Sequence, residues 1–244
     1  MKPSQWIAPW LSGTLLAGSV TCPYLAWIAF LPLLWALEKT QSLRMGFYLT
    51  YCASLPIWVM AYGGAFHLQP TLMALLILAL GLGYGLVGLG VVFFREKMQT
   101  AWAFALLWLA CETLNALGNF GSWSNPISIG YAQADSPLLK AAFWSGVHGV
   151  AWLVLVFNGC VYQGVRTRKI QPMLLGLGLL VVATCLPQAL SQTKKAPVQK
   201  QLRLAVVQGA IAPEEHRKAY LWPETRRNLI KRYRKLSKYA AQMH

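Results

Sequence analysis

Apolar residues up to Leu186 occur in long runs that short polar or turn-forming segments separate. A helix that spans a membrane needs roughly 20 apolar residues. The first two runs and the last are short by this standard. We expect the first two to form a hairpin that turns at Thr21–Pro23 and either spans or re-enters the membrane. The pattern predicts seven spans, at Trp6–Val20, Tyr24–Leu37, Met45–Tyr62, Thr71–Phe94, Ala101–Leu117, Leu138–Tyr162 and Pro172–Leu186.

The pattern changes after the seventh run. A polar linker at 191–201 leads into Leu202–Gln208, which is typical of the opening strand of a soluble domain. A helix is predicted over Glu224–Ala241, with an apolar stripe on one side and basic residues around it. Alone, such a helix would lie on a membrane surface; inside a domain, it is an outer helix. We therefore expect a helical membrane domain at 1–190 and an α/β domain that begins at 202–244.

Composition supports a membrane protein, and the charge pattern predicts its orientation. The chain is 56% hydrophobic and 12% charged, whereas soluble domains are roughly 25% charged. Of its 22 basic residues, 13 follow Leu186, and the remaining loops are strongly asymmetric. This asymmetry predicts a cytoplasmic N-terminus and an outer segment after Leu186, which in a bacterium is periplasmic. It leaves no reason to expect nucleic acid. The cytoplasmic loops hold Lys2, Lys39, Arg44, Arg95, Lys97, Arg166, Arg168 and Lys169, against Lys140 alone outside.

Candidate chemistry concentrates near the outer ends of the fifth and sixth spans. Glu112 is the one acid well inside a predicted span, so we expect it to face the bundle interior. The following loop, Gly118–Gln133, interleaves turn residues with Phe120, Trp123 and Tyr131. It is either an interfacial anchor or a lipid-facing rim around an active site. The five scattered cysteines have no metal-ligand spacing, so neither a metal nor a cofactor is predicted.

Several short motifs in this region carry a resemblance when they are taken in order. They are Trp108–Glu112, Phe120–Trp123, Gly130–Gln133, Gly146–Gly149 and Asn158. In this order and topology the chain resembles the bacterial apolipoprotein N-acyltransferases. Further similarity lies at Ala8–Trp10, Leu31–Leu34, Gly46–Phe47, Trp58–Val59 and Val206–Gly209, the last resembling the start of the family's nitrilase-like domain.

The chain departs from the family pattern at three places. Asn115 stands where the family usually has Arg, and Gly121-Ser122 replaces the Pro of a Phe-Pro-Trp motif. Ala210–Pro213 replaces an Asn-Ile-Pro string. These differences affect the expected substrate contacts and leave the resemblance intact.

The resemblance implies lipoprotein maturation in the bacterial inner membrane. Such enzymes move an acyl chain from a phospholipid to the N-terminal Cys amine of a diacylated lipoprotein, through a thioester on an enzyme cysteine. The implied lipid-contacting rim is Glu112, Phe120, Trp123, Tyr131 and Gln133.

The catalytic Glu-Lys-Cys set of such a nitrilase-like αββα sandwich is expected beyond His244. The string Trp222–Thr225 matches the family's catalytic Glu motif, but it precedes the predicted helix, so Glu224 is interpreted as a decoy. The expectation is therefore either a truncated acyltransferase or a split one. In the split form, a separate chain would complete the nitrilase-like domain that begins at 202–244. The alternative is a non-catalytic membrane protein that binds lipid or lipoprotein through the outer loop.

Overall fold

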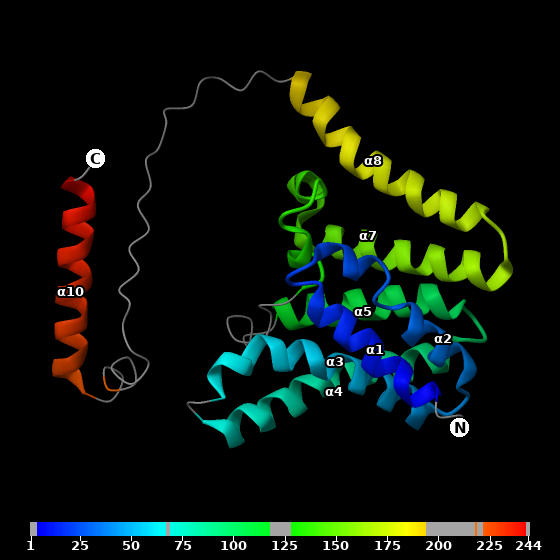
Figure 1. Ribbon diagram of the computed structural model, residues 1–244, viewed down its shortest axis with the longest axis horizontal. Coiled ribbons are helices and arrows are strands. Elements are labelled where there is room, and N and C mark those ends of the chain that lie inside the picture. Colours follow the sequence, from blue (N-terminus) through cyan, green and yellow to red (C-terminus); the bar gives the residue numbers. More distant parts are fainter. Residues whose placement is uncertain (1–3, 67–68, 118–127, 194–217, 219–221, 243–244) are drawn as a thin grey trace. The chain divides into compact units, whose positions relative to one another are not determined.

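The computed structural model describes residues 4–66, 69–117, 128–193, 218 and 222–242. The chain divides into two compact units, Met1–Lys194 and Lys195–His244, and each is described by itself. Helices make up all the regular structure of the described residues (Figure 1). The predicted strand Leu202–Gln208 lies outside the described residues.

The helices of the first unit follow one another in this order. They are α1 (Ser4–Gly18), η1 (Pro23–Trp27), α2 (Leu31–Lys39), α3 (Leu43–Tyr62), η2 (Gly63–Ala65), α4 (Pro70–Phe94), α5 (Thr100–Leu117), η3 (Tyr131–Gln133), α7 (Leu139–Thr167) and α8 (Gln171–Thr193).

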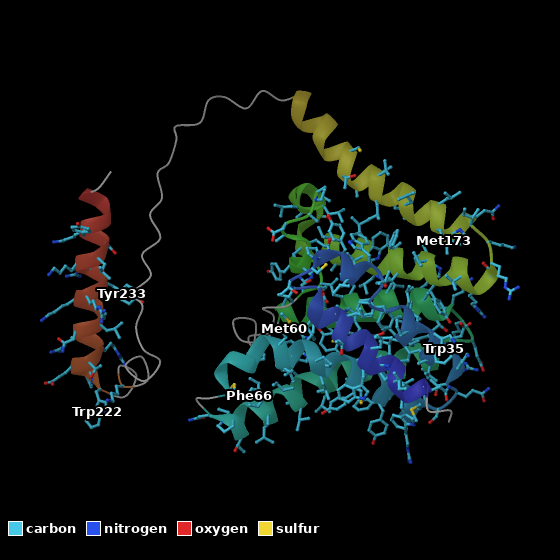
Figure 2. All side chains as sticks on the ribbon, viewed as in Figure 1. Trp35, Met60, Phe66, Met173, Trp222 and Tyr233 are labelled. Atoms are coloured by element: carbon cyan, nitrogen blue, oxygen red, sulfur yellow. The ribbon has the colours of Figure 1, made fainter. Side chains whose placement is uncertain are left out.

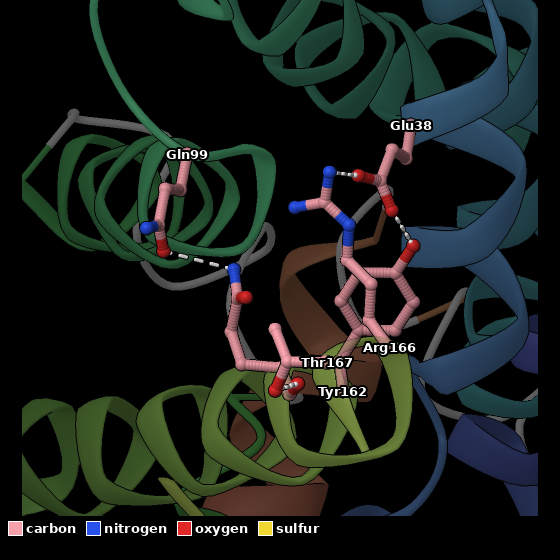
Figure 3. Close-up of polar contacts among 6 residues, drawn as sticks. Glu38, Gln99, Tyr162, Arg166 and Thr167 are labelled. Carbon is pink, nitrogen blue, oxygen red and sulfur yellow. Dashed lines mark hydrogen bonds and ion pairs between the residues drawn. The ribbon is translucent and has the colours of Figure 1, made fainter. Parts of the chain in front are cut away.

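The loops that follow α2, α4 and α7 meet at one end of this bundle. The Nη1 atom of Arg95, after α4, donates to the carbonyl of Thr40, after α2, at 2.7 Å. Near the end of α7, Arg166 pairs with Glu38 of α2 at 2.5 Å, and the Tyr162 hydroxyl bonds the same carboxylate (Figure 3). We call this the basic end, because most of the basic residues of the first unit lie there. The opposite end, where residues 128–138 lie, is called the loop end.

The second predicted span, Tyr24–Leu37, is wrong as a single helix. The structure breaks it into the 3-10 helix η1 and the nine-residue helix α2, with turn residues between them. Pro23 and Pro32 each lie in the first turn of their helix. Proline suits that position, but inside a helix it removes a hydrogen bond and clashes with the preceding turn. The hydrophobic pattern could not predict this break, because the apolar run continues across it.

Two helices among the described residues are long and apolar enough to cross a membrane: α4, and residues Ser145–Thr167 of α7. The apolar stretch Gln171–Cys185 of α8 is shorter. Helix α1 has 15 residues and α2 has nine, below the roughly 20 that a span needs. Spanning length and apolarity are thus found for two of the seven predicted spans, and the helical bundle itself is confirmed.

The outer face of α4 is apolar along its whole length. Its buried face combines glycine, tyrosine and branched aliphatic residues, whereas Leu75, Leu82, Leu86 and Phe93 are between 52% and 63% exposed. Helix α8 carries a similar exposed set that includes Leu174, Leu177 and Val181 (Figure 2 shows all side chains). Contiguous apolar patches of this kind are rare on soluble monomers.

Helices α3 and α4 lie side by side and approach at glycines (Figure 1). A Cβ atom added to Gly88 would lie 2.0 Å from the carbonyl oxygen of Gly46. Thr50 fills the same contact, since its Oγ1 accepts from Gly88 N at 3.1 Å and lies 3.1 Å from the Gly46 carbonyl. Small residues permit this close backbone contact.

An aromatic cluster joins α2, α3, α4 and α5 in the core. Trp108 lies at its centre, with ring centroids 4.5 Å from Tyr84, 4.9 Å from Phe30 and 5.2 Å from Phe104. Tyr84 also contacts Trp58 at 6.0 Å. The α5 helix therefore has a fixed rotation, which determines where Glu112, one turn after Trp108, points.

The described part of the second unit is mainly α10 (Pro223–Gln242), which confirms the helix predicted at Glu224–Ala241. Leu229 and Tyr233 are partly covered, whereas Leu236 is 37% exposed. Glu224 lies in the first turn and is exposed. An acid at this position interacts favourably with the helix dipole.

Candidate functional site

Glu112 is a buried carboxylate that three donors surround. It is 1% exposed and accepts hydrogen bonds from Trp108 Nε1 at 3.0 Å and Ser128 Oγ at 2.7 Å. The backbone N–H of Ile129 is a longer third donor at 3.4 Å. A buried carboxylate is costly without such partners. Here two of the three lie in residues 128–133, the last part of the Gly118–Gln133 loop, which we call the loop segment. Glu112 therefore anchors that segment to α5.

The same segment contacts α7 where its helix is broken. Gly146 has φ +64° and ψ −174°, a conformation that only glycine adopts readily, and it interrupts α7. Gly130 packs here, since a Cβ atom added to it would lie 2.2 Å from the carbonyl oxygen of Val147. Gly130 N also donates to Ser128 Oγ at 3.2 Å. Three of the sequence motifs, at 108–112, 130–133 and 146–149, thus meet in one place.

Gln133 and Asn158 tie the η1–α2 bend to the same region. Gln133, at the end of η3, is buried and its Nε2 donates to the Pro23 carbonyl at 2.9 Å. Asn158 of α7 accepts from Phe30 N at 3.1 Å and donates to the Ala26 carbonyl at 2.9 Å. The two Asn158 bonds satisfy backbone groups that the break between η1 and α2 leaves without helical partners, and the Gln133 bond holds the start of η1.

A cavity of about 280 Å³ opens at the loop end beside this network. Its size is close to the lower limit of roughly 300 Å³ for small-molecule sites. Ser128 is both part of its wall and the donor to Glu112, so the buried carboxylate fixes one wall of the cavity. The lining is Ser19 and Val20 after α1, Ile57, Met60 and Ala61 of α3, and Ser128, Ile129, Tyr131 and Ala132.

Comparison with known proteins identifies the family. A sequence profile described as the apolipoprotein N-acyltransferase N-terminal domain matches residues 12–160, which is more than half of the chain. The chain belongs to this family. The matched region includes the second half of α1, all of α2 to α5 and most of α7. It also includes Glu112, Asn158 and every residue that lines the cavity.

Two curated apolipoprotein N-acyltransferases are similar to this family member at modest identity. The protein of Coxiella burnetii is 27% identical over 144 residues, which are 57% of this chain and 28% of the relative. The protein of Geobacter metallireducens is 29% identical over 172 residues, 64% of this chain and 32% of the relative. The chain thus spans less than a third of the length of either apolipoprotein N-acyltransferase.

The predicted rim residues of this acyltransferase family member lie in different surroundings. Tyr131 is 54% exposed and lines the cavity. Glu112 and Gln133 are buried behind the wall and position the loop segment. Phe120 and Trp123 lie outside the described residues. Contact of this set with lipid stays a prediction.

Sequence reasoning missed two kinds of site residue in this family member. Ser128 lies in the loop that the sequence analysis singled out, two residues before Gly130. The available signal was that the hydroxyl of a loop serine can donate to the acid predicted to be buried at Glu112. Met60, labelled in Figure 2, lines the cavity from the last turns of α3. No local signal marks Met60, because its position depends on how α1 packs against α3.

Proposed function

We propose that this chain is the membrane part of a bacterial apolipoprotein N-acyltransferase. The reaction is transfer of an acyl chain from a phospholipid to the N-terminal Cys amine of a diacylated lipoprotein. The observation that carries the proposal is the loop-end cavity, because it lies wholly within the region that matches the family.

The cavity suits an acyl chain. Most of its wall is apolar, with Ile57, Met60 and Ala61 on α3 facing Ile129 of the loop segment. Hydrocarbon removed from water gains about 25 cal/mol per Å² of apolar surface buried. A phospholipid tail would lie against this wall with its ester near Ser128 and the exposed Tyr131. In this proposal the cavity binds and orients the acyl chain, and no described residue is assigned a catalytic role.

Exposed apolar faces support placement in a membrane. Leu86 of α4 and Leu174 of α8 belong to outward-facing apolar sets that a bilayer would cover. We propose that the basic end faces the cytoplasm of the bacterial inner membrane and the loop end faces the periplasm. In this orientation the cavity opens in the leaflet that supplies the donor phospholipid. The lipoprotein substrate would approach from the periplasm.

Photo-crosslinking tests the cavity. The purified chain is placed in phospholipid nanodiscs with a phospholipid that carries a photoreactive group on its acyl chain. Ala61→Phe fills the cavity, and we expect it to reduce labelling of the segment 128–132 several-fold. The matched control is Ala110→Phe on the exposed face of α5, which should leave this labelling unchanged. Equal labelling of wild type and Ala61→Phe would remove the proposed acyl-binding role.

A second assay separates acyl transfer from simple binding. The chain is incubated together with a separately expressed nitrilase-like domain of an apolipoprotein N-acyltransferase, because the catalytic set is expected outside this chain. The substrates are a phospholipid that carries a labelled acyl chain and a diacylated lipopeptide that has a free N-terminal Cys amine. Acyltransfer predicts a labelled amide on the lipopeptide that resists hydroxylamine. Cavity labelling without any amide would favour the alternative, a membrane protein that binds lipid or lipoprotein without catalysis.

A further inference from the structure

A second cavity, of about 510 Å³, lies at the basic end between the start of α1 and the α2–α3 connection. It is far from the loop-end cavity. The same helix α3 contributes Arg44 and Tyr48 here and Ile57 to Ala61 there. The centres of these two stretches are roughly 20 Å apart along the helix axis at about 1.5 Å per residue. The basic-end cavity therefore needs an explanation of its own.

The charged side chains that line this cavity are all basic among the described residues. Lys39 and Arg44 line it, and none of the described residues that line it is acidic. The neighbouring cavity at the same end is different, because Glu38 and Glu96 accompany its basic residues. There, Arg166 is already paired with Glu38 (Figure 3). The cavity at Lys39 and Arg44 is thus the one that favours an anion.

The Lys39 side of this cavity is held in place by contacts with its surroundings. The Lys39 ammonium lies 3.9 Å from the centroid of the Trp35 ring, which is labelled in Figure 2. The next residue, Thr40, is buried, and its carbonyl accepts from Arg95 at 2.7 Å. The connection between α2 and α3 is therefore tied to the end of α4. A preorganised site loses less entropy when a ligand binds.

Exposed apolar side chains flank the cavity on both helices. Ile7 follows the cavity residue Gln5 on α1 and is 64% exposed. On α3, Tyr48 lines the cavity and is 53% exposed, and Leu43 is 43% exposed. Tyrosine is enriched in the headgroup region of a bilayer. A ligand with an anionic head and long apolar tails matches both surfaces.

We propose that this cavity binds the phosphate headgroup of an anionic diacyl phospholipid, such as phosphatidylglycerol, with its tails along α1 and α3. Basic pockets between membrane helices bind anionic headgroups elsewhere. Lys39 and Arg44 contact the phosphate, and Gln5 and Ser42 supply polar contacts to the rest of the head. The site is independent of acyl transfer, since the lipid is held at the opposite end of the bundle and is not consumed.

Native mass spectrometry of the purified chain tests the proposal. The chain is kept in a neutral detergent and titrated with phosphatidylglycerol or with phosphatidylcholine of the same acyl chains. We expect one preferred phosphatidylglycerol adduct. The double variant Lys39→Gln/Arg44→Gln should weaken it roughly 30-fold, since each basic residue near a membrane surface contributes about fivefold. Lys97→Gln is the matched control, because it removes one exposed charge from the neighbouring cavity.

Two further arms make the test decisive. Gln41→Glu adds an acid to the exposed lining without removing any contact of the core, and it should weaken phosphatidylglycerol binding. This variant provides the test if the double variant does not fold. Soluble glycerol phosphate, added as a competitor, should displace little lipid. Equal binding of the two lipids, equal loss in Lys97→Gln, or full displacement by glycerol phosphate would each overturn the phospholipid site.

Discussion

At the scale of single residues, Glu112 is the side chain on which the loop-end cavity most depends. Glu112→Ala would leave the Trp108 N–H and the Ser128 hydroxyl buried without their acceptor. We expect a loss of about 3 kcal/mol in the free energy of unfolding, measured by denaturation in mixed micelles. Glu112→Gln keeps one oxygen as an acceptor and should lose less. The control Glu96→Ala removes an exposed acid and should leave the unfolding free energy nearly unchanged. Equal effects of the two Ala variants would contradict the anchoring role.

Asn158 provides a second test at this scale. Asn158→Leu keeps the approximate volume but leaves the Phe30 N–H and the Ala26 carbonyl without a partner. We expect about 2 kcal/mol of destabilisation and faster proteolysis within the η1–α2 bend. Thr184→Val is the comparison, because the Thr184 hydroxyl bonds only groups of its own helix, the carbonyls of Leu180 and Val181 and the Cys185 thiol. The same loss in both variants would mean that the bend does not depend on Asn158.

At the scale of helices, the α3–α4 contact depends on glycine. In Gly88→Ala the new Cβ atom would meet the Gly46 carbonyl at 2.0 Å and Thr50 Oγ1 at 2.3 Å. The helices must separate, and we expect a loss of about 1–3 kcal/mol. The matched control is Gly178→Ala on α8, where no atom lies within 4 Å of the added Cβ. Alanine is the better helix former, so this control should be neutral or slightly stabilising. Denaturation of both variants in the same detergent gives the comparison, and a neutral Gly88→Ala would disprove the close contact.

The helices were predictable from the sequence where the local pattern of apolar residues alone determines them. Helix α4, expected at Thr71–Phe94, begins one residue earlier and ends where predicted. The second predicted span failed because proline breaks a helix without interrupting an apolar run. The burial of Glu112 was expected from its position inside a span. Its bond with Ser128 was not expected, because that contact depends on how the loop segment returns to α5.

The cavity could not have been predicted at all from local pattern. Its wall combines the end of α1, the last turns of α3 and the segment 128–132. These segments converge only through tertiary contacts such as Gln133 to Pro23 and Gly130 to Val147. The motifs nevertheless named the correct neighbourhood, because Trp108–Glu112, Gly130–Gln133 and Gly146–Gly149 are the segments that meet there.

At the scale of the whole molecule, the first unit has its apolar and polar surfaces arranged as a bilayer requires. Exposed apolar residues cover the outside of α4 and α8, while Glu112 and Asn158 are satisfied inside. Lys39, Arg95 and Arg166 gather at one end. The positive-inside rule then assigns that end to the cytoplasm, which is a prediction about the orientation of the entire bundle.

Cysteine accessibility tests that orientation. Cys22 is exposed after α1 at the loop end, and Gln41 is exposed at the basic end. A chain that keeps Cys22 as its single cysteine should react with a membrane-impermeant maleimide in intact spheroplasts. A chain whose single cysteine comes from Gln41→Cys should react only after permeabilisation, because the basic end would face the cytoplasm. The reverse pattern would mean an inverted bundle. Labelling of both chains in intact spheroplasts would mean that the two ends are not separated by a membrane.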